Sequence, residues 1–171
     1  MILETPRLML REITHDDFAA WHEILSDAET MEHYPAPFTK EKVRSWIEWS
    51  LRNYREHGFG LWAVILKETG EFIGDCGITL QNIDGEQLPE VGYHIHKAHQ
   101  RKGYASEAAR ACIDYAFAHF DFPAIYSYMK YTNSASYNTA IKCGLTFVKE
   151  YPDPINTYTR VYRILRSEHK A

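Results

Sequence analysis

The segment at residues 99–109, HQRKGYASEAA, contains the residue types that bind a phosphate group. It joins a β-rich run to a segment with strong helical periodicity, and the free N–H groups at a helix N-terminus attract anions. Gly103 removes a side chain where a ligand must approach the backbone. Arg101 and Lys102 add positive charge suited to a pyrophosphate, and Ala105 keeps the next turn thin. On these residues alone, a solvated connection whose glycine relieves strain is the simpler interpretation.

Histidines and cysteines are the other residues whose types could do chemistry. His94 and His96 place two imidazoles on one face of a predicted strand, with His99 close behind. No suitably placed cysteine or carboxylate completes a ligand set, so we expect ordinary strand histidines and no metal. None of the cysteines has the setting of an activated thiolate, because they fall in a strand, on an apolar helix face and near a helix end (Cys76, Cys112 and Cys143).

These residues need elements that position them, and the sequence predicts the order strand, two helices, a mostly antiparallel meander, helix, strand, helix and two strands. The clearest helix has apolar residues at i, i+3 and i+4 spacing from Ala105 to Phe117. Capping residues predict three more helices, at 14–26, 39–58 and 133–144. Strands are predicted at 7–11, 61–66, 72–80, 90–96, 125–131, 145–150 and 157–165. This order predicts an α/β fold built on one mixed sheet.

The composition is that of a globular chain, with 171 residues, 45% hydrophobic and 25% charged. This length favours a single domain over residues 1–171. No run of about 18 apolar residues is available to span a membrane, and the N-terminus lacks the apolar region of a secretory signal. Three scattered cysteines fit a reducing compartment, so we expect a cytoplasmic protein. A net charge of −4 gives no reason to expect binding to nucleic acid or to an anionic membrane.

Three separated motifs resemble the GNAT superfamily of acetyltransferases. Residues 100–105, QRKGYA, resemble its pyrophosphate loop, Q/R-x-x-G-x-G/A, and follow a strand, EVGYHIH, similar to the family's fourth strand. Residues 133–136, NSAS, followed by 142–145, KCGL, resemble the N-x-x-S…K-x-G-F segment of one branch, which includes the N-terminal acetyltransferases of ribosomal proteins. The opening at 5–11, TPRLMLR, looks like the first strand of that branch. The similarity spans nearly the whole chain, and the combination is far more specific than any one motif.

The resemblance implies a fold and a cosubstrate. The fold would be α/β (α+β), with a single mixed, mostly antiparallel sheet, splayed parallel strands four and five, and about four flanking helices. Acetyl-CoA would enter the gap between those strands, with its pantetheine bonded to the backbone of the fourth strand. Asn133 would bond to pantetheine or the thioester region as well as capping a helix. The expected cofactor-binding residues are His94, Ile95, His96, Gln100, Arg101, Lys102, Gly103, Tyr104, Ala105, Ser106, Asn133 and Ser136.

Acetyl transfer to an amine needs a neutral nucleophile, so a base must remove a proton from the ammonium group. Glu90, which begins the predicted fourth strand, is the candidate base, with a pKa raised by partial burial; a surface carboxylate is the alternative interpretation. Ser136 is the family-guided candidate for protonating or hydrogen-bonding the leaving sulfur. Many family members have a tyrosine where this chain has Ala140, which is a departure from the pattern. Tyr137 falls on an apolar stripe, so we expect it to pack in the core.

The acceptor is expected to bind between residues 32–38, the predicted helix 39–58 and a loop near 153–156. Trp49 lies off the apolar stripe of that helix, so we expect it to be exposed and to mark an acceptor or partner surface. An exposed strand edge or Trp49 would support a homodimer. The leading prediction is an N-acetyltransferase acting on a primary amine, either a protein N-terminus or a small molecule. The alternatives are a non-catalytic acyl-CoA sensor, favoured by Ala140, and an interaction domain without a coenzyme A site.

Overall fold

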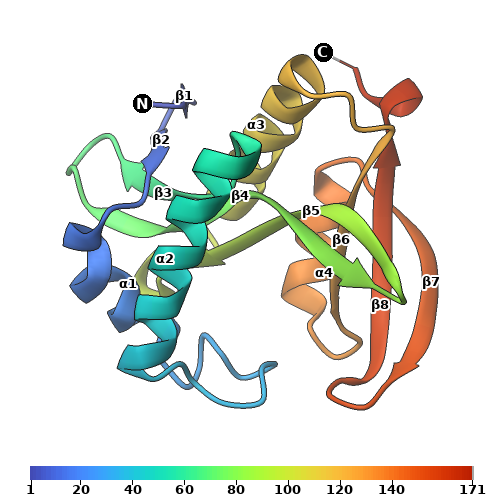
Figure 1. Cartoon of the computed structure of the whole chain (residues 1–171), viewed down its shortest axis with the longest axis horizontal. Helices are drawn as coiled ribbons and strands as arrows, with labels where there is room; N and C mark the ends of the chain where they lie inside the picture. The colour runs from blue at the N-terminus through green and yellow to red at the C-terminus, as the bar shows by residue number, and fades with distance from the viewer. Residues whose placement is uncertain (171) are drawn as a thin grey trace.

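Eight strands form one mixed sheet in the computed structural model, which describes residues 1–170 (Figure 1). The spatial order is β1-β2-β3-β4-β5-β6-β8-β7, and every neighbouring pair is antiparallel except β5 and β6. The predicted fold, a mostly antiparallel sheet with one parallel pair, is confirmed. The strands are β1 (Leu3–Glu4), β2 (Leu8–Glu12), β3 (Leu61–Leu66), β4 (Phe72–Ile83), β5 (Glu86–Ile95), β6 (Ala124–Lys130), β7 (Thr146–Asp153) and β8 (Thr157–Leu165).

Helices flank this sheet, and most begin at the residues that the sequence indicates. The α-helices of the described chain are α1 (Phe18–Leu25), α2 (Lys40–His57), α3 (Tyr104–His119) and α4 (Ser134–Lys142). Thr39 and Asn133 cap α2 and α4 through their side chains. The segment expected to start a helix at Thr14 instead forms a 3-10 turn, His15–Asp17, before α1. Within residues 1–170 no helix has both the length and the apolar character needed to cross a membrane.

Two hydrophobic cores lie on opposite faces of the sheet, and β3 contributes to both. Side chains alternate across a strand, so the even positions of β3, beginning with Trp62, pack with α3, whereas the odd positions, beginning with Leu61, pack with α1 and α2. All six residues of β3 are buried. The sheet therefore holds α3 and α4 on one side and α1 and α2 on the other.

The hairpin between β4 and β5 is longer than the sequence predicts. Gly85 indicates a loop and the strand is predicted to begin at Glu90, but β5 begins at Glu86. Asp84 and Gly85 both have positive φ, at 50° and 86°, which suits a two-residue turn between antiparallel strands. Because Ile83 pairs with Glu86, the ladder continues to the turn.

The parallel strands β5 and β6 touch at one position. Their register contains a single pair, Glu90 with Tyr126, although β5 has 10 residues and β6 has 7. Beyond this pair β6 continues beside β8, and β5 continues beside β4. The two strands therefore part, and backbone groups along the edge of β5 are left without a neighbouring strand.

Candidate active site

A cavity of about 450 Å³ lies where β5 and β6 part. Both strands line it, together with the loop after α1, the start of α4, and the loop between β7 and β8. The sequence-predicted residues that it brings together are Glu90, His94, Asn133 and Ser136. Further lining residues that matter below are Tyr34, Trp46, Trp49, Tyr93, Tyr128 and Lys130.

The backbone of β5 shows which residues can bond to a ligand in the gap. The His96 amide donates to Ile73 O on the β4 side at 2.7 Å. Backbone groups of successive strand residues point to alternate edges, so those of His94 and His96 face β4, whereas those of Tyr93 and Ile95 face the gap. Gln100 Nε2 donates to Ile95 O at 2.9 Å. Of the residues expected to bond to pantetheine on this strand, only Tyr93 and Ile95 therefore direct their backbone groups into the gap. The Gln100 side chain lies beside them.

The predicted phosphate turn precedes α3. Gly103 is the N-cap of α3, with φ at 83°, and Arg101 also has a positive φ of 63°. Glu107 N donates to Gly103 O at 3.0 Å, so the amides of Tyr104, Ala105 and Ser106 precede the first complete turn and lack helical acceptors. This is the arrangement that favours an anion at a helix N-terminus.

The N-terminal segment braces this turn. Arg7 Nη1 donates to Lys102 O at 2.9 Å, and Arg7 Nε pairs with Glu107 Oε1 at 2.7 Å. Thr5 Oγ1 donates to the other oxygen of Glu107 at 2.6 Å. The Arg7 guanidinium also lies 4.3 Å from the ring centre of Tyr104. The sequence motif at 5–11 thus has a structural role that sequence reasoning missed, which is to hold the turn and the first turn of α3 together.

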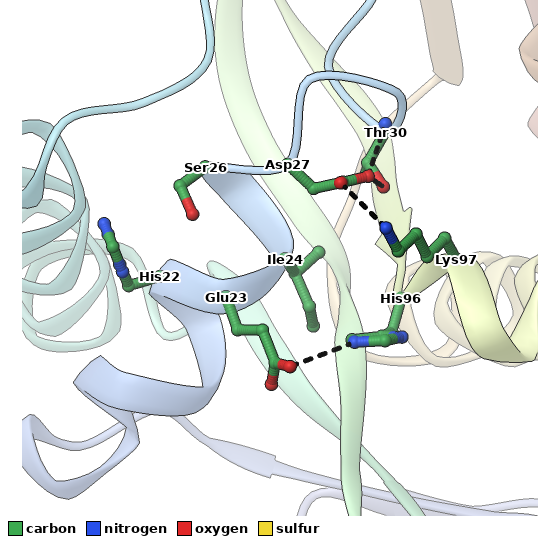
Figure 2. Close-up of a pocket in the computed structure, with 8 residues that line it drawn as sticks. All are labelled: His22, Glu23, Ile24, Ser26, Asp27, Thr30, His96 and Lys97. Atoms are coloured by element: carbon green, nitrogen blue, oxygen red, sulfur yellow. Dashed lines mark hydrogen bonds and ion pairs between the residues drawn. The ribbon is translucent and has the colours of Figure 1, made fainter.

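A second hollow lies on the α1 side of the end of β5 (Figure 2). His96 pairs with Glu23 at 3.6 Å, and Lys97 pairs with Asp27 at 3.3 Å. Figure 2 shows both basic side chains directed toward α1 and the loop that follows it. His99 has its own partner, Glu71, at 3.2 Å. The closely spaced histidines of the sequence therefore have separate carboxylate partners.

Glu90 is buried, so the surface interpretation of this carboxylate is wrong. It is 9% exposed and lines the cavity at the one β5–β6 pair. The next residue on its face is Gly92, where a side-chain β-carbon would lie 3.3 Å from Glu90 Oε1. Burial raises the pKa of Glu90 well above its usual range. A hydrogen bond from the backbone N–H of Tyr128 lowers this pKa, whereas the nearby Asp75 charge raises it further. A raised carboxyl pKa suits proton transfer near neutral pH.

Ser136 lies beside a phenol that sequence reasoning missed. Tyr93 donates its hydroxyl to Ser136 O at 2.8 Å, and the same hydroxyl is 3.5 Å from Ser136 Oγ. Burial raises the pKa of Tyr93, which keeps the phenol protonated at neutral pH. Asn133 Oδ1 accepts from Ser136 N at 3.2 Å, which leaves the amide nitrogen of Asn133 as a donor at the cavity. Ala140 is 2% exposed and packs in the core.

Aromatic side chains form the wall opposite the strands. Trp46 lies 4.8 Å from Phe38 and 5.5 Å from Trp49, measured between ring centres. Trp49 is half-buried and lines the cavity, so the expectation that it is exposed is wrong. It lies one helical turn beyond Trp46, at the flank of the apolar stripe, so it lines the cavity and also packs against the core that α1 and α2 form with the sheet. Tyr137, as expected, packs against the core, parallel to Tyr162.

A buried carboxylate, Asp75, connects the core to this wall. Trp21 Nε1 donates to Asp75 Oδ2 at 2.7 Å, and His94 Nδ1 lies 3.1 Å from each Asp75 oxygen. His94 Nε2 lies 2.7 Å from the Tyr34 hydroxyl. Asp75 and His94 are paired in the register of β4 and β5, so the sheet itself brings them together. From the sequence, His94 is considered as a metal ligand and as a residue of the pantetheine strand, whereas Asp75 is not considered.

Comparisons with known proteins agree with this geometry. A family model described as an acetyltransferase (GNAT) domain matches residues 7–146. YkkB, an uncharacterized protein of Bacillus subtilis (strain 168), is 36% identical over 162 residues, covering 92% of this chain and 94% of YkkB. The crystal structure of an acetyltransferase from Agrobacterium tumefaciens str. C58 has a TM-score of 0.80 at 30% identity, covering 95% of this chain and 92% of that chain. RimL, a ribosomal L7/L12 alpha-N-protein acetyltransferase solved with coenzyme A, shares the fold, with a TM-score of 0.79 at 14% identity, covering 96% of this chain and 97% of that chain.

Proposed function

The chain belongs to the GNAT family of acetyltransferases, and we propose on that basis that it transfers acetyl from acetyl-CoA to a primary amine in a ternary complex. The observation that supports this most is the cavity between the parted strands β5 and β6, because it connects free strand backbone with a buried carboxylate. The amine would belong to a protein N-terminus or to a small molecule. The setting that we propose is the cytoplasm.

Groups of this chain would contact the pyrophosphate, the pantetheine and the thioester region of an acyl-CoA. Amides of residues 101–106 would hold the pyrophosphate, with Arg101 and Lys102 supplying positive charge. Backbone groups of Tyr93 and Ile95 would bond to pantetheine, as a neighbouring strand does. Asn133, with a free amide donor, would bond to pantetheine near the thioester.

In the proposed reaction, the acceptor ammonium loses two protons; Glu90 takes one of them, directly or through water, and the other passes to water or to a second group of the cavity. The nitrogen attacks the thioester carbonyl, and the tetrahedral intermediate collapses with loss of the thiolate. Ser136 hydrogen-bonds the leaving sulfur or relays a proton to it, and the Tyr93 phenol lies 3.5 Å from its hydroxyl oxygen. Ala140 has a methyl side chain that packs in the core, so this position of α4 supplies no hydroxyl.

The decisive experiment combines binding and turnover on the purified full chain. We expect acetyl-CoA to raise the Tm, because a ligand that binds only the folded state stabilises it. Mass spectrometry with isotopically labelled acetyl-CoA and a panel of amines should then detect an acetylated product. A Tm shift without any product would favour the acyl-CoA sensor, and no shift would remove the coenzyme A site.

Variants test the assigned residues. We expect Glu90→Gln and Ser136→Ala to lower turnover while the Kd for acetyl-CoA stays within a few-fold of wild type. Glu86→Gln is the matched control, because it makes the same change at an exposed position of the same strand. Full activity in Glu90→Gln across pH would remove Glu90 from the mechanism, and undiminished turnover in Ser136→Ala would remove the serine.

A further inference from the structure

A line of hydrogen-bonded side chains runs from the core to the acceptor side of the cavity. Trp21 donates to Asp75, Asp75 faces the His94 ring, and the other side of that ring meets the Tyr34 hydroxyl. Asp75 is 0% exposed, and the His94 side chain is 9% exposed. The line ends at the cavity, because Tyr34 and His94 both line it.

Chemistry assigns the direction of these bonds. An ionised carboxylate can only accept, so His94 Nδ1 carries the proton that lies between it and Asp75. The neutral ring then has a free lone pair on Nε2, which accepts the Tyr34 hydroxyl proton at 2.7 Å. A buried negative charge beside the ring stabilises the imidazolium that forms when Nε2 gains a proton. Within residues 1–170 the only ion-pair partner of Asp75 is His94.

The two ends of the cavity differ in exposure. Tyr34 is 39% exposed and belongs to the loop between α1 and α2, whereas Glu90 is 9% exposed and lies at the β5–β6 pair. Tyr34 is therefore the more solvent-accessible of these two groups. Between Glu90 and His94 the same strand face has only Gly92, so no side chain separates the two groups on that face.

Amide formation removes two protons from the acceptor nitrogen, one from the ammonium before attack and one from the nitrogen after attack. We propose that Tyr34, His94 and Asp75 form a proton relay that receives the first of these protons, leaving Glu90 to receive the second. This inference rests on the proposed acetyltransferase function. The ammonium N–H bond breaks and its proton bonds to Tyr34 Oη. The original Tyr34 proton passes to His94 Nε2, and Asp75 stabilises the imidazolium. After product release, His94 Nε2 returns the proton to Tyr34 Oη, and the partly exposed Tyr34 hydroxyl releases its own proton to water.

Within this relay, Tyr34 is the residue that contacts the amine, and His94 and Asp75 are positioning residues that act through Tyr34. Other titratable or charged groups line the same cavity, and they come from the loop after α1 and from β5, β6 and β7. These groups are His33, Glu90, Tyr93, Tyr128, Lys130, Tyr151 and Asp153. None of them bonds to His94, whose polar partners are Asp75 and Tyr34. The pH dependence of the relay is therefore expected to follow variants of these two partners.

The test compares Tyr34→Phe and Asp75→Asn with wild type across pH 6 to 9, at saturating acetyl-CoA. We expect kcat/KM for the amine to fall by about 10²-fold near neutral pH. The deficit should shrink as the pH approaches the pKa of the amine, because neutral amine is then supplied by solution. The Kd for acetyl-CoA should not change. His22→Gln, a histidine change on α1 outside the cavity, is the control and should match wild type.

Each outcome decides the proposal. A deficit of equal size at every pH, or a wild-type profile in Tyr34→Phe, would overturn the relay while leaving acetyl transfer intact. Absence of product from wild type with every amine would instead refute the proposed function, and the relay with it. If Asp75→Asn fails to fold, the partly exposed Tyr34→Phe carries the kinetic test. Independently of turnover, ¹⁵N NMR of wild type should show the His94 ring protonated at Nδ1 and not at Nε2; the opposite tautomer would overturn the relay.

Discussion

Replacing Glu90 by Gln should make the protein progressively more stable than wild type as the pH rises from the unfolded pKa of glutamate to the native pKa, above which Glu90 is the carboxylate that can act as a base. The native pKa of this carboxyl lies well above its unfolded value, because burial disfavours the charged form. Between the two values the folded state holds a proton that the unfolded state has lost. The free energy of unfolding of wild type therefore falls with rising pH, whereas the amide of Glu90→Gln does not titrate.

The size of the effect follows from the linkage relation. Each pH unit between the unfolded and the native pKa costs wild type about 1.4 kcal/mol relative to the variant. For a chain of 171 residues this corresponds to a Tm difference that grows by roughly 3–6 °C per pH unit. The difference should level off above the native pKa, so the position of the plateau measures that pKa.

The assay is thermal unfolding of wild type, Glu90→Gln and Glu86→Gln from pH 5 to 8 at constant ionic strength. Glu86→Gln, at an exposed position of β5, controls for the loss of one charge from the chain. A Tm difference between wild type and Glu90→Gln that stays constant over this range would refute the reasoning. The burial of Glu90 would then have no effect on its ionisation, and its suitability as a base would lose its physical basis.

Three further predictions concern the phosphate turn and the sheet. Gly103→Ala should weaken coenzyme A binding measured by calorimetry, since a φ of 83° is costly for alanine. Gly85→Ala is the control, because Gly85 has a φ of 86° in a distant turn; this variant should lose a comparable stability of about 1–2 kcal/mol and keep its affinity for coenzyme A. Burial opposes the ionisation of Glu107, but hydrogen bonds from its N-terminal partners lower its pKa. Wild type should therefore lose stability faster than Glu107→Gln as pH falls from 5 to 3 in urea titrations, and parallel curves would contradict this. Gly77→Ala should cost about 3 kcal/mol or more, because a β-carbon would lie 1.9 Å from Gly60 O; a loss under about 1 kcal/mol would show that the strands separate easily.

Local patterns in the sequence were enough to predict most elements. The apolar face of α3 and the caps at Thr39 and Asn133 are set by residues close in the chain, so their positions follow from periodicity and capping chemistry. The extension of β5 back to Glu86 was missed because it begins with two polar residues after Gly85 and contains Pro89, which is uncommon inside a strand. Pairing with β4 stabilises this extension as a strand, which a local pattern does not reveal.

The candidate site also has a part that the sequence predicts and a part that only the folded chain brings together. The phosphate turn is contiguous in sequence, so a motif could identify it together with the acetyltransferase family, which the comparisons confirm. The burial of Glu90 and the contact between Tyr93 and Ser136 depend on strands and helices far apart in the chain. Such contacts have no signature in residue spacing.

The sequence by itself determined the family, most strands and helices, and the turn that we propose binds phosphate, because each motif or element rests on residues within a few positions of one another. Only the tertiary structure decided that β5 and β6 part, that Trp49 lines a cavity, and that Asp75, His94 and Tyr34 form a continuous hydrogen-bonded line. The physical reason is that burial, and with it the pKa of a carboxyl group, is set by which distant segments pack around a residue.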